Sequence, residues 1–236
     1  MSDRGVRVLA YLVVGLANIV AFAAVHQLGG VKSPIIIFLS LLPLNLVVTL
    51  VHELGHAWMA KRRGAQVERI AVLPFQYDAA ARKFGFASRN PDSEIGGYIL
   101  YAFEDFDEMR RDAALIAGAG PAVNLLLAIV ILLLVLAWPA PPGPFAASGA
   151  APVEVVVAIP DDRVAIRPMP QVPPDDTTRA RVFAEHDAYR VSEARYLVGR
   201  GLAIALALLS LGAALANLVP FRGSDGYVLR DALFRR

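Results

Sequence analysis

Four long stretches of the chain are almost free of Asp, Glu, Lys and Arg. Each is long enough to cross a bilayer, whose hydrocarbon core needs about 20 apolar residues in a helix. The pattern predicts an α-helical polytopic membrane protein with transmembrane helices at residues 8–30, 34–60, 113–138 and 199–221. The first stretch also resembles a signal peptide, with a basic start and Ala21-Phe22-Ala23 as a cleavage site. Its apolar run exceeds the roughly 7 to 15 residues of such a peptide, which favours a retained helix.

Two regions lie outside these spans. Residues 66–103 contain two β-type runs separated by Gly, Pro, Asn and Asp, at 67–75 and 97–103. They predict a small β-sheet or a pair of hairpins. Residues 139–198 begin with Pro, Ala and Gly, and continue with a strand-like run and then a polar helix or coil, at 153–159 and 177–196.

The basic residues predict how the chain is oriented, because positive charge beside a membrane helix tends to remain in the cytoplasm. Lys and Arg flank one end of each span, at Arg4, Arg7, Lys61, Arg62, Arg63, Arg110, Arg111 and Arg222. This places both termini and the β-rich segment in the cytoplasm and residues 139–198 outside, although that loop has Arg residues of its own. The excess of Arg over Lys and the abundance of Ala favour a bacterial cytoplasmic membrane.

Composition narrows the chemistry. Of the 236 residues, 56% are hydrophobic and only 19% are charged, and none is Cys. The absence of Cys excludes disulfide scaffolds, thiolate nucleophiles and iron–sulfur clusters, so a metal ion would need His, Asp or Glu ligands. The net charge is only +2 and the Arg residues are dispersed, which argues against a nucleic-acid partner.

One motif in the chain is typical of a metal-binding site. His52-Glu53-Leu54-Gly55-His56 matches H-E-x-x-H near the cytoplasmic end of the second predicted helix. Helical spacing places His52 and His56 one turn apart on one face, so both imidazoles can reach one metal ion with Glu53 beside it. A polar patch used in helix packing is the alternative, but ionisable groups at this depth are costly and indicate a functional site.

Catalytic zinc normally has three protein ligands and one open position. His26 and His186 are predicted on the other side of the membrane from the motif. The cytoplasmic candidates for the third ligand are Asp225, which follows the fourth helix and is beside Gly226, and an acidic cluster before the third helix, Glu104, Asp105, Asp107 and Glu108. We favour Asp225, because acidic residues in the cluster suit the first turn of a helix.

Three motifs in order resemble those of the site-2 protease family (M50-type) of intramembrane zinc metalloproteases. They are His52-Glu53-Leu54-Gly55-His56-Ala57, the segment at 118–124 (GAGPAVN), and the segment at 217–226 that begins Asn217-Leu218-Val219-Pro220 and ends Asp225-Gly226. By this resemblance, His52, His56 and Asp225 would bind one zinc ion. Glu53 would be the general base toward the activated water, and Asn217 would hydrogen-bond the scissile carbonyl or its oxyanion.

Other expectations from the resemblance are less specific. Asn124 is a candidate for substrate binding, whereas Gly118, Gly120 and Pro121 would serve packing and helix entry. Asn217 has an interhelical hydrogen bond as its alternative role. The strands within residues 66–103 would lie near the active site, where a free edge could pair with an unwound substrate.

The predicted function is hydrolysis of peptide bonds in transmembrane segments, as in regulated intramembrane proteolysis. Its partners would be transmembrane protein substrates and the lipid bilayer. The first alternative is a catalytically silent adaptor or chaperone that binds transmembrane helices, against which the intact Glu53 argues. A small transporter or metal carrier would need a polar path through both leaflets, and the outer halves of the helices offer little for one.

Overall fold

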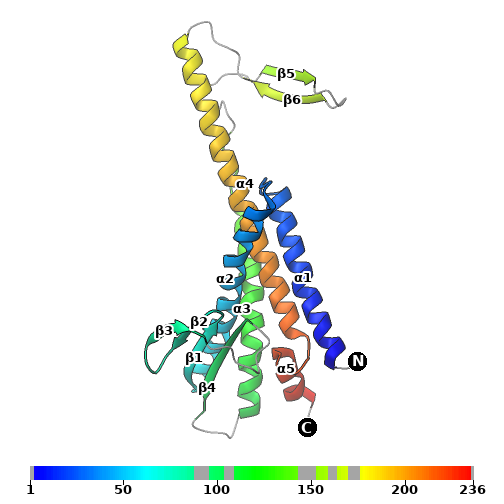
Figure 1. The fold of residues 1–236 in the computed structure, drawn as a ribbon, viewed down its shortest axis with the longest axis vertical. Coiled ribbons are helices and arrows are strands. Elements are labelled where there is room, and N and C mark those ends of the chain that lie inside the picture. The colour runs from blue at the N-terminus through cyan, green and yellow to red at the C-terminus, as the bar shows by residue number, and fades with distance from the viewer. Residues whose placement is uncertain are drawn as a thin grey trace. The chain divides into compact units, whose positions relative to one another are not determined.

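The computed structural model describes residues 3–87, 96–103, 109–142, 153–158, 164–169 and 176–234 (Figure 1). The helices are α1 (Asp3–Gln27), α2 (Pro34–Arg62), α3 (Met109–Ala137), α4 (Asp176–Leu218) and α5 (Asp225–Phe234). The strands are β1 (Gln66–Val72), β2 (Phe75–Asp78), β3 (Lys83–Phe86), β4 (Gly97–Ala102), β5 (Val153–Ala158) and β6 (Val164–Met169). The chain forms two compact units, one of Met1–Ala137 with Arg200–Arg236 and one of Trp138–Gly199.

Among the described residues, four helices are long and apolar enough to cross a membrane: Asp3–Gln27, Pro34–Arg62, Arg111–Ala137 and Phe183–Leu218. This confirms the predicted fold class. The observed bounds differ from the predicted ones at several places: the first helix already begins at Asp3, the last candidate span already begins at Phe183, and two of the ends have a clear local cause. The first helix ends at Gln27, just before Gly30, whose φ of 67° is outside the helical region. The last span ends at Leu218 because Pro220 disfavours helical backbone in the residue before it.

The start and end of α2 follow from its sequence. Ser33 caps the helix by accepting a hydrogen bond from the backbone N–H of Ile36 at 3.5 Å, and Pro34 occupies the first turn, where no N–H is needed. Lys61 and Arg62 lie in the last turn, where positive charge complements the helix dipole. The motif-bearing turn is thus near a well-defined helix end.

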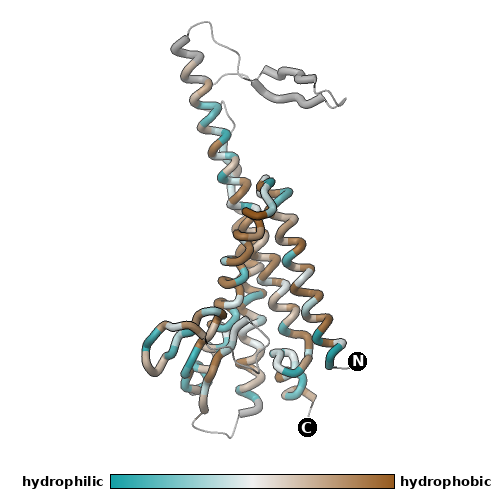
Figure 2. The backbone as a smooth tube through the Cα atoms, viewed as in Figure 1, coloured by the Kyte–Doolittle hydropathy of each residue, from teal (hydrophilic) through white to brown (hydrophobic). Residues whose placement is uncertain are grey.

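Small residues allow the helices of the first unit to pack closely. A Cβ added at Gly212 of α4 would collide with Ala17 of α1, and one added at Gly55 of α2 would lie 2.9 Å from the carbonyl oxygen of Ala119 in α3. Such contacts are typical of membrane bundles. Large apolar side chains such as Leu12 and Phe38 are exposed on the outer faces, and Figure 2 shows the apolar colouring along these helices.

A four-stranded antiparallel sheet with the order β3-β2-β1-β4 follows α2. This confirms the small sheet predicted within residues 66–103, although the first β-type run turns after Val72 and continues as β2 from Phe75. The sequence did not predict β3. Strand β4 pairs along β1 from Gln66 opposite Ala102 to Val72 opposite Gly97.

The second unit contains an antiparallel pair, β5 and β6, and the N-terminal part of α4. Strand β5 occupies the strand-like run expected at 153–159, and β6 was not expected. The segment 177–196, for which helix and coil were both open, is helical and continuous with the last span. The acidic cluster at 104–108 lies outside the described residues.

Candidate metal centre

The two histidines of the H-E-x-x-H motif face each other inside the first unit. Their Nε2 atoms are 3.0 Å apart, and the rings meet edge to face. The motif is buried inside the bundle: the exposed fraction is 6% for His52, 5% for Glu53 and 7% for His56. Burial of three ionisable groups on adjacent turns is costly unless they bind something.

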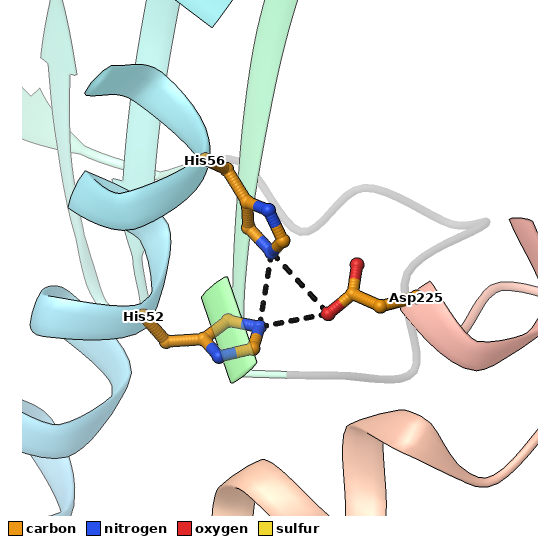
Figure 3. A group of neighbouring side chains, drawn as sticks. All are labelled: His52, His56 and Asp225. Atoms are coloured by element: carbon orange, nitrogen blue, oxygen red, sulfur yellow. Dashed lines mark hydrogen bonds and ion pairs between the residues drawn. The ribbon is translucent and has the colours of Figure 1, made fainter. Parts of the chain in front are cut away.

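The third ligand candidate comes from the far end of the chain. Asp225 is the first residue of α5, and its Oδ2 lies 3.1 Å from Nε2 of His52 and 3.3 Å from Nε2 of His56. Figure 3 shows the three side chains pointing at a common centre. Among the described residues, these three form a group that could hold a metal ion.

Ser224 determines where Asp225 points. Its Oγ is 2.7 Å from the carbonyl oxygen of Val219 and 2.8 Å from that of Phe221, and it accepts hydrogen bonds from the backbone N–H groups of Phe221 and Tyr227. Ser224 is 2% exposed, so these contacts are not shared with bulk water. The side chain therefore caps α5 and fixes the loop that precedes the carboxylate.

Electrostatics keep the Asp225 carboxyl ionised. Burial alone would raise its pKa, but hydrogen bonds from His52 and His56, together with their charge, hold the pKa below its ordinary value. An anionic oxygen beside two imidazole nitrogens is a ligand set that divalent transition metals accept.

The three atoms fit a zinc ion in spacing as well as in chemistry. Tetrahedral ligands at roughly 2.0–2.1 Å from zinc are about 3.3 Å from one another, and the observed separations run from 3.0 to 3.3 Å. The Nδ1 of His56 lies 2.6 Å from the carbonyl oxygen of Ile116, to which it can only donate. In the neutral form of the ring, which is the form that binds a metal ion, this leaves the Nε2 lone pair of His56 directed at the centre.

Helix α3 makes room for both imidazoles at Gly120. A Cβ at this position would overlap Nε2 of His56 and would lie 2.8 Å from Cε1 of His52. The sequence predicted only a packing role for Gly120. Its contact with the ligands could not be inferred from the G-x-G-P pattern, because the pattern does not say which helix face meets α2.

A cavity of about 540 Å³ opens beside the histidines and Asp225. Glu53 and Asn217 both line it. The Nδ2 of Asn217 donates to the carbonyl oxygen of Ala213 at 3.0 Å within its own helix. Asn124 does not line the cavity: it is fully buried, with its Nδ2 3.4 Å from Nδ1 of His52.

Strand β4 forms one wall of the cavity, through Gly97, Tyr98, Ile99 and Tyr101. The start of the strand approaches the motif so closely that a Cβ at Gly97 would lie 2.6 Å from Oε1 of Glu53. Tyr101 was not predicted from the sequence, because a tyrosine in a strand pattern is ordinary. Burial, and then the charge of Asp225, raise the pKa of Tyr101, so its phenol stays protonated and can donate a hydrogen bond.

Apolar helices carry an H-E-x-x-H motif, and its two histidines meet an Asp from a distant helix. This combination of fold and site is typical of the class of membrane-embedded metallopeptidases. The family comparison is specific. The model of Peptidase family M50 matches residues 40–236, and the chain therefore belongs to this family of membrane metalloproteases, the site-2 protease family. No match was found among curated proteins or among solved structures.

Proposed function

We propose that the protein is an intramembrane zinc metalloprotease that cleaves peptide bonds within transmembrane segments of other proteins. The observation that carries this proposal is the convergence of the nitrogen ligands of His52 and His56 with the carboxylate of Asp225, in one cavity with Glu53. Membership of Peptidase family M50 supports the same reaction class.

Zinc is the ion that this donor set favours, because two imidazoles and one carboxylate with an open position are typical of hydrolytic zinc sites. We propose one ion per chain, held by His52, His56 and Asp225. When bound, it supplies Lewis-acid polarisation of the scissile carbonyl and lowers the pKa of water. The remaining steps fall to residues of the chain.

Glu53 is the proposed proton carrier. Its carboxylate lies in the cavity next to the ligands, one residue from His52, and can accept the proton of the attacking water. It can then pass this proton to the nitrogen of the leaving amine. Asn217 lines the same cavity, and its side-chain amide is the proposed hydrogen-bond donor to the scissile carbonyl oxygen.

The substrate is proposed to bind as an extended strand beside β4. A transmembrane helix satisfies its backbone internally, so it must unwind before a peptide bond is accessible. Among the described strands, β4 has a sheet neighbour only on its β1 side, and its residues line the cavity. A strand paired to the other side would gain backbone hydrogen bonds at the point of cleavage.

The charge distribution supports an orientation with both termini in the cytoplasm. The end of α2 and the start of α3 lie at the end of the unit that contains the sheet and α5 (Figure 1). Basic residues occupy these helix ends: Lys61, Arg62 and Arg63 at α2, and Arg111 at α3. We propose that residues 1–236 form one membrane-embedded protease domain of a bacterial cytoplasmic membrane, with residues 139–198 as an extracytoplasmic loop. The cavity would then face the cytoplasmic side.

The test compares wild type with Glu53→Gln, which removes the proton acceptor and keeps the three ligands. Each purified protein is reconstituted with a library of single-span polypeptides in liposomes, and new peptide termini are mapped by mass spectrometry. Cleavage within transmembrane segments by wild type alone is expected. His26→Ala is the control, because His26 lies outside the metal group and contacts the carbonyl of Val31 instead.

Zinc-loaded wild type that produces no more termini than Glu53→Gln would contradict the proposed activity. Retention of bound single-span polypeptides without cleavage would then point to a helix-binding adaptor. Cleavage that persists in Glu53→Gln would instead contradict the role of Glu53.

A further inference from the structure

One stripe of α3 complements the two histidines of α2. Ile116, Gly120 and Asn124 are four residues apart and therefore share one face of the helix. The carbonyl of Ile116 meets Nδ1 of His56 at 2.6 Å, and Gly120 leaves space for both rings. The amide of Asn124 reaches Nδ1 of His52 at 3.4 Å.

The burial of Asn124 calls for a role other than contact with a substrate. The side chain has 0% exposure and does not line the cavity. An amide withdrawn from water is costly unless it is hydrogen-bonded. Its Oδ1 has no hydrogen-bond partner among the residues that the structure describes, and its Nδ2 faces an imidazole nitrogen.

The chemistry of the imidazole determines which amide atom belongs there. When Nε2 of a neutral histidine binds a metal ion, its proton is on Nδ1, which must donate. The amide nitrogen cannot accept that hydrogen bond, whereas Oδ1 can. A half turn about the last side-chain bond of Asn124 exchanges the two atoms, so that the buried Oδ1 gains a donor from His52.

We infer that Asn124 is a positioning residue: through Oδ1 it accepts a hydrogen bond from Nδ1 of His52 and holds that ring with Nε2 toward Asp225. This inference rests on the proposed zinc site. His56 receives the equivalent support from the backbone carbonyl of Ile116. Each ligand of α2 is therefore oriented by an oxygen of α3, one from the main chain and one from a side chain.

Two variants separate an acceptor from a merely space-filling side chain. Asn124→Leu keeps the branched shape and the number of side-chain heavy atoms and removes the acceptor, whereas Asn124→Asp supplies an obligate acceptor. Ser210→Ala is the control, because Ser210 is also a fully buried polar residue but lies in α4 away from the cavity. For each protein in detergent, zinc affinity is measured by chelator competition, the visible spectrum of the cobalt-substituted site is recorded, and thermal unfolding is followed without metal.

Asn124→Leu is expected to bind zinc about 10- to 100-fold more weakly than wild type and to alter the cobalt spectrum. Asn124→Asp is expected to bind zinc within about threefold of wild type or more tightly, with the wild-type spectral pattern. Ser210→Ala should match wild type in both measurements. Metal-free unfolding separates these effects from a general loss of stability.

Undiminished zinc affinity with an unchanged cobalt spectrum in Asn124→Leu would overturn the inference while leaving the zinc site intact. A folded Asn124→Asp protein that loses zinc would also overturn it, and this arm stands even where Asn124→Leu does not fold. Wild type that binds no zinc would instead contradict the proposed function. The two failures are thus distinguishable.

Discussion

Gly120 contributes to the metal centre because the absence of a side chain leaves space for the histidine rings. Any side chain at this position of α3 would occupy the space of the His56 ring. Helix α3 cannot move away to make room, because it is packed against its own neighbours. In the part of the chain that the structure describes, a Cβ added at Gly118, two residues earlier in the same helix, would have only Leu229 within 4 Å, with a Cβ-to-Cδ2 distance of 3.7 Å. The two glycines therefore provide a matched pair.

Gly120→Ala is expected to lose zinc affinity by at least about tenfold, because the added methyl displaces a ligand ring. Gly118→Ala should bind zinc like wild type and unfold at an equal or higher temperature, because Ala favours a helix over Gly by about 0.5–1 kcal/mol. Zinc titration and thermal unfolding of both variants check this. Equal zinc affinity in the two variants would show that Gly120 does not shape the site.

At the residue scale, the sequence predicted which side chains could be ligands but not what surrounds them. The i, i+4 spacing was enough to place His52 and His56 on one face of a helix. Asp225 was favoured by elimination of the acidic cluster, and the resemblance supported that choice, because Asp225 alone could equally have been an exposed turn aspartate. The environment of Asn124 could not be predicted, because burial on the face toward α2 is a tertiary property.

At the element scale, the short helix α5 presents Asp225 because Ser224 caps its first turn. Ser224→Ala removes this cap and is expected to lower the free energy of unfolding by about 0.5–2 kcal/mol. It should also weaken zinc binding, because the carboxylate loses its fixed direction.

The control for this prediction is Ser192→Ala in α4, whose hydroxyl donates to the carbonyl of Tyr189 on an exposed turn. It should leave stability and zinc affinity unchanged. Chelator competition and denaturant unfolding are the measurements. If Ser224→Ala and Ser192→Ala behave alike, the cap does not position the third ligand.

The helices show which whole elements the sequence pattern can predict and which it cannot. Absence of charge predicted all four spans, because the bilayer excludes charged side chains from its core. It could not predict that α4 continues without a break from residue 176, because a polar helix and a polar coil have similar composition. Strand β3 was missed for a related reason: its four exposed residues carry no burial pattern.

At the scale of the whole molecule, the positive charges predict that the metal centre faces the cytoplasm. A reporter that is active only in the cytoplasm should be active when fused after Arg236 and inactive when inserted at residue 142. The reverse pattern would contradict the proposed orientation. Activity at both positions would place residue 142 and the C-terminus on the same side of the membrane, which would contradict a single crossing by α4.

The central claim is that His52, His56 and Asp225 bind one zinc ion. It is tested most directly by elemental analysis of detergent-purified protein, with His56→Ala and Asp225→Ala beside wild type and His26→Ala as the control. We predict about one zinc per chain in wild type and His26→Ala, and loss of zinc in both ligand variants. Folded wild type with little or no zinc would contradict the account, and zinc retained by Asp225→Ala would show that Asp225 is not the third ligand.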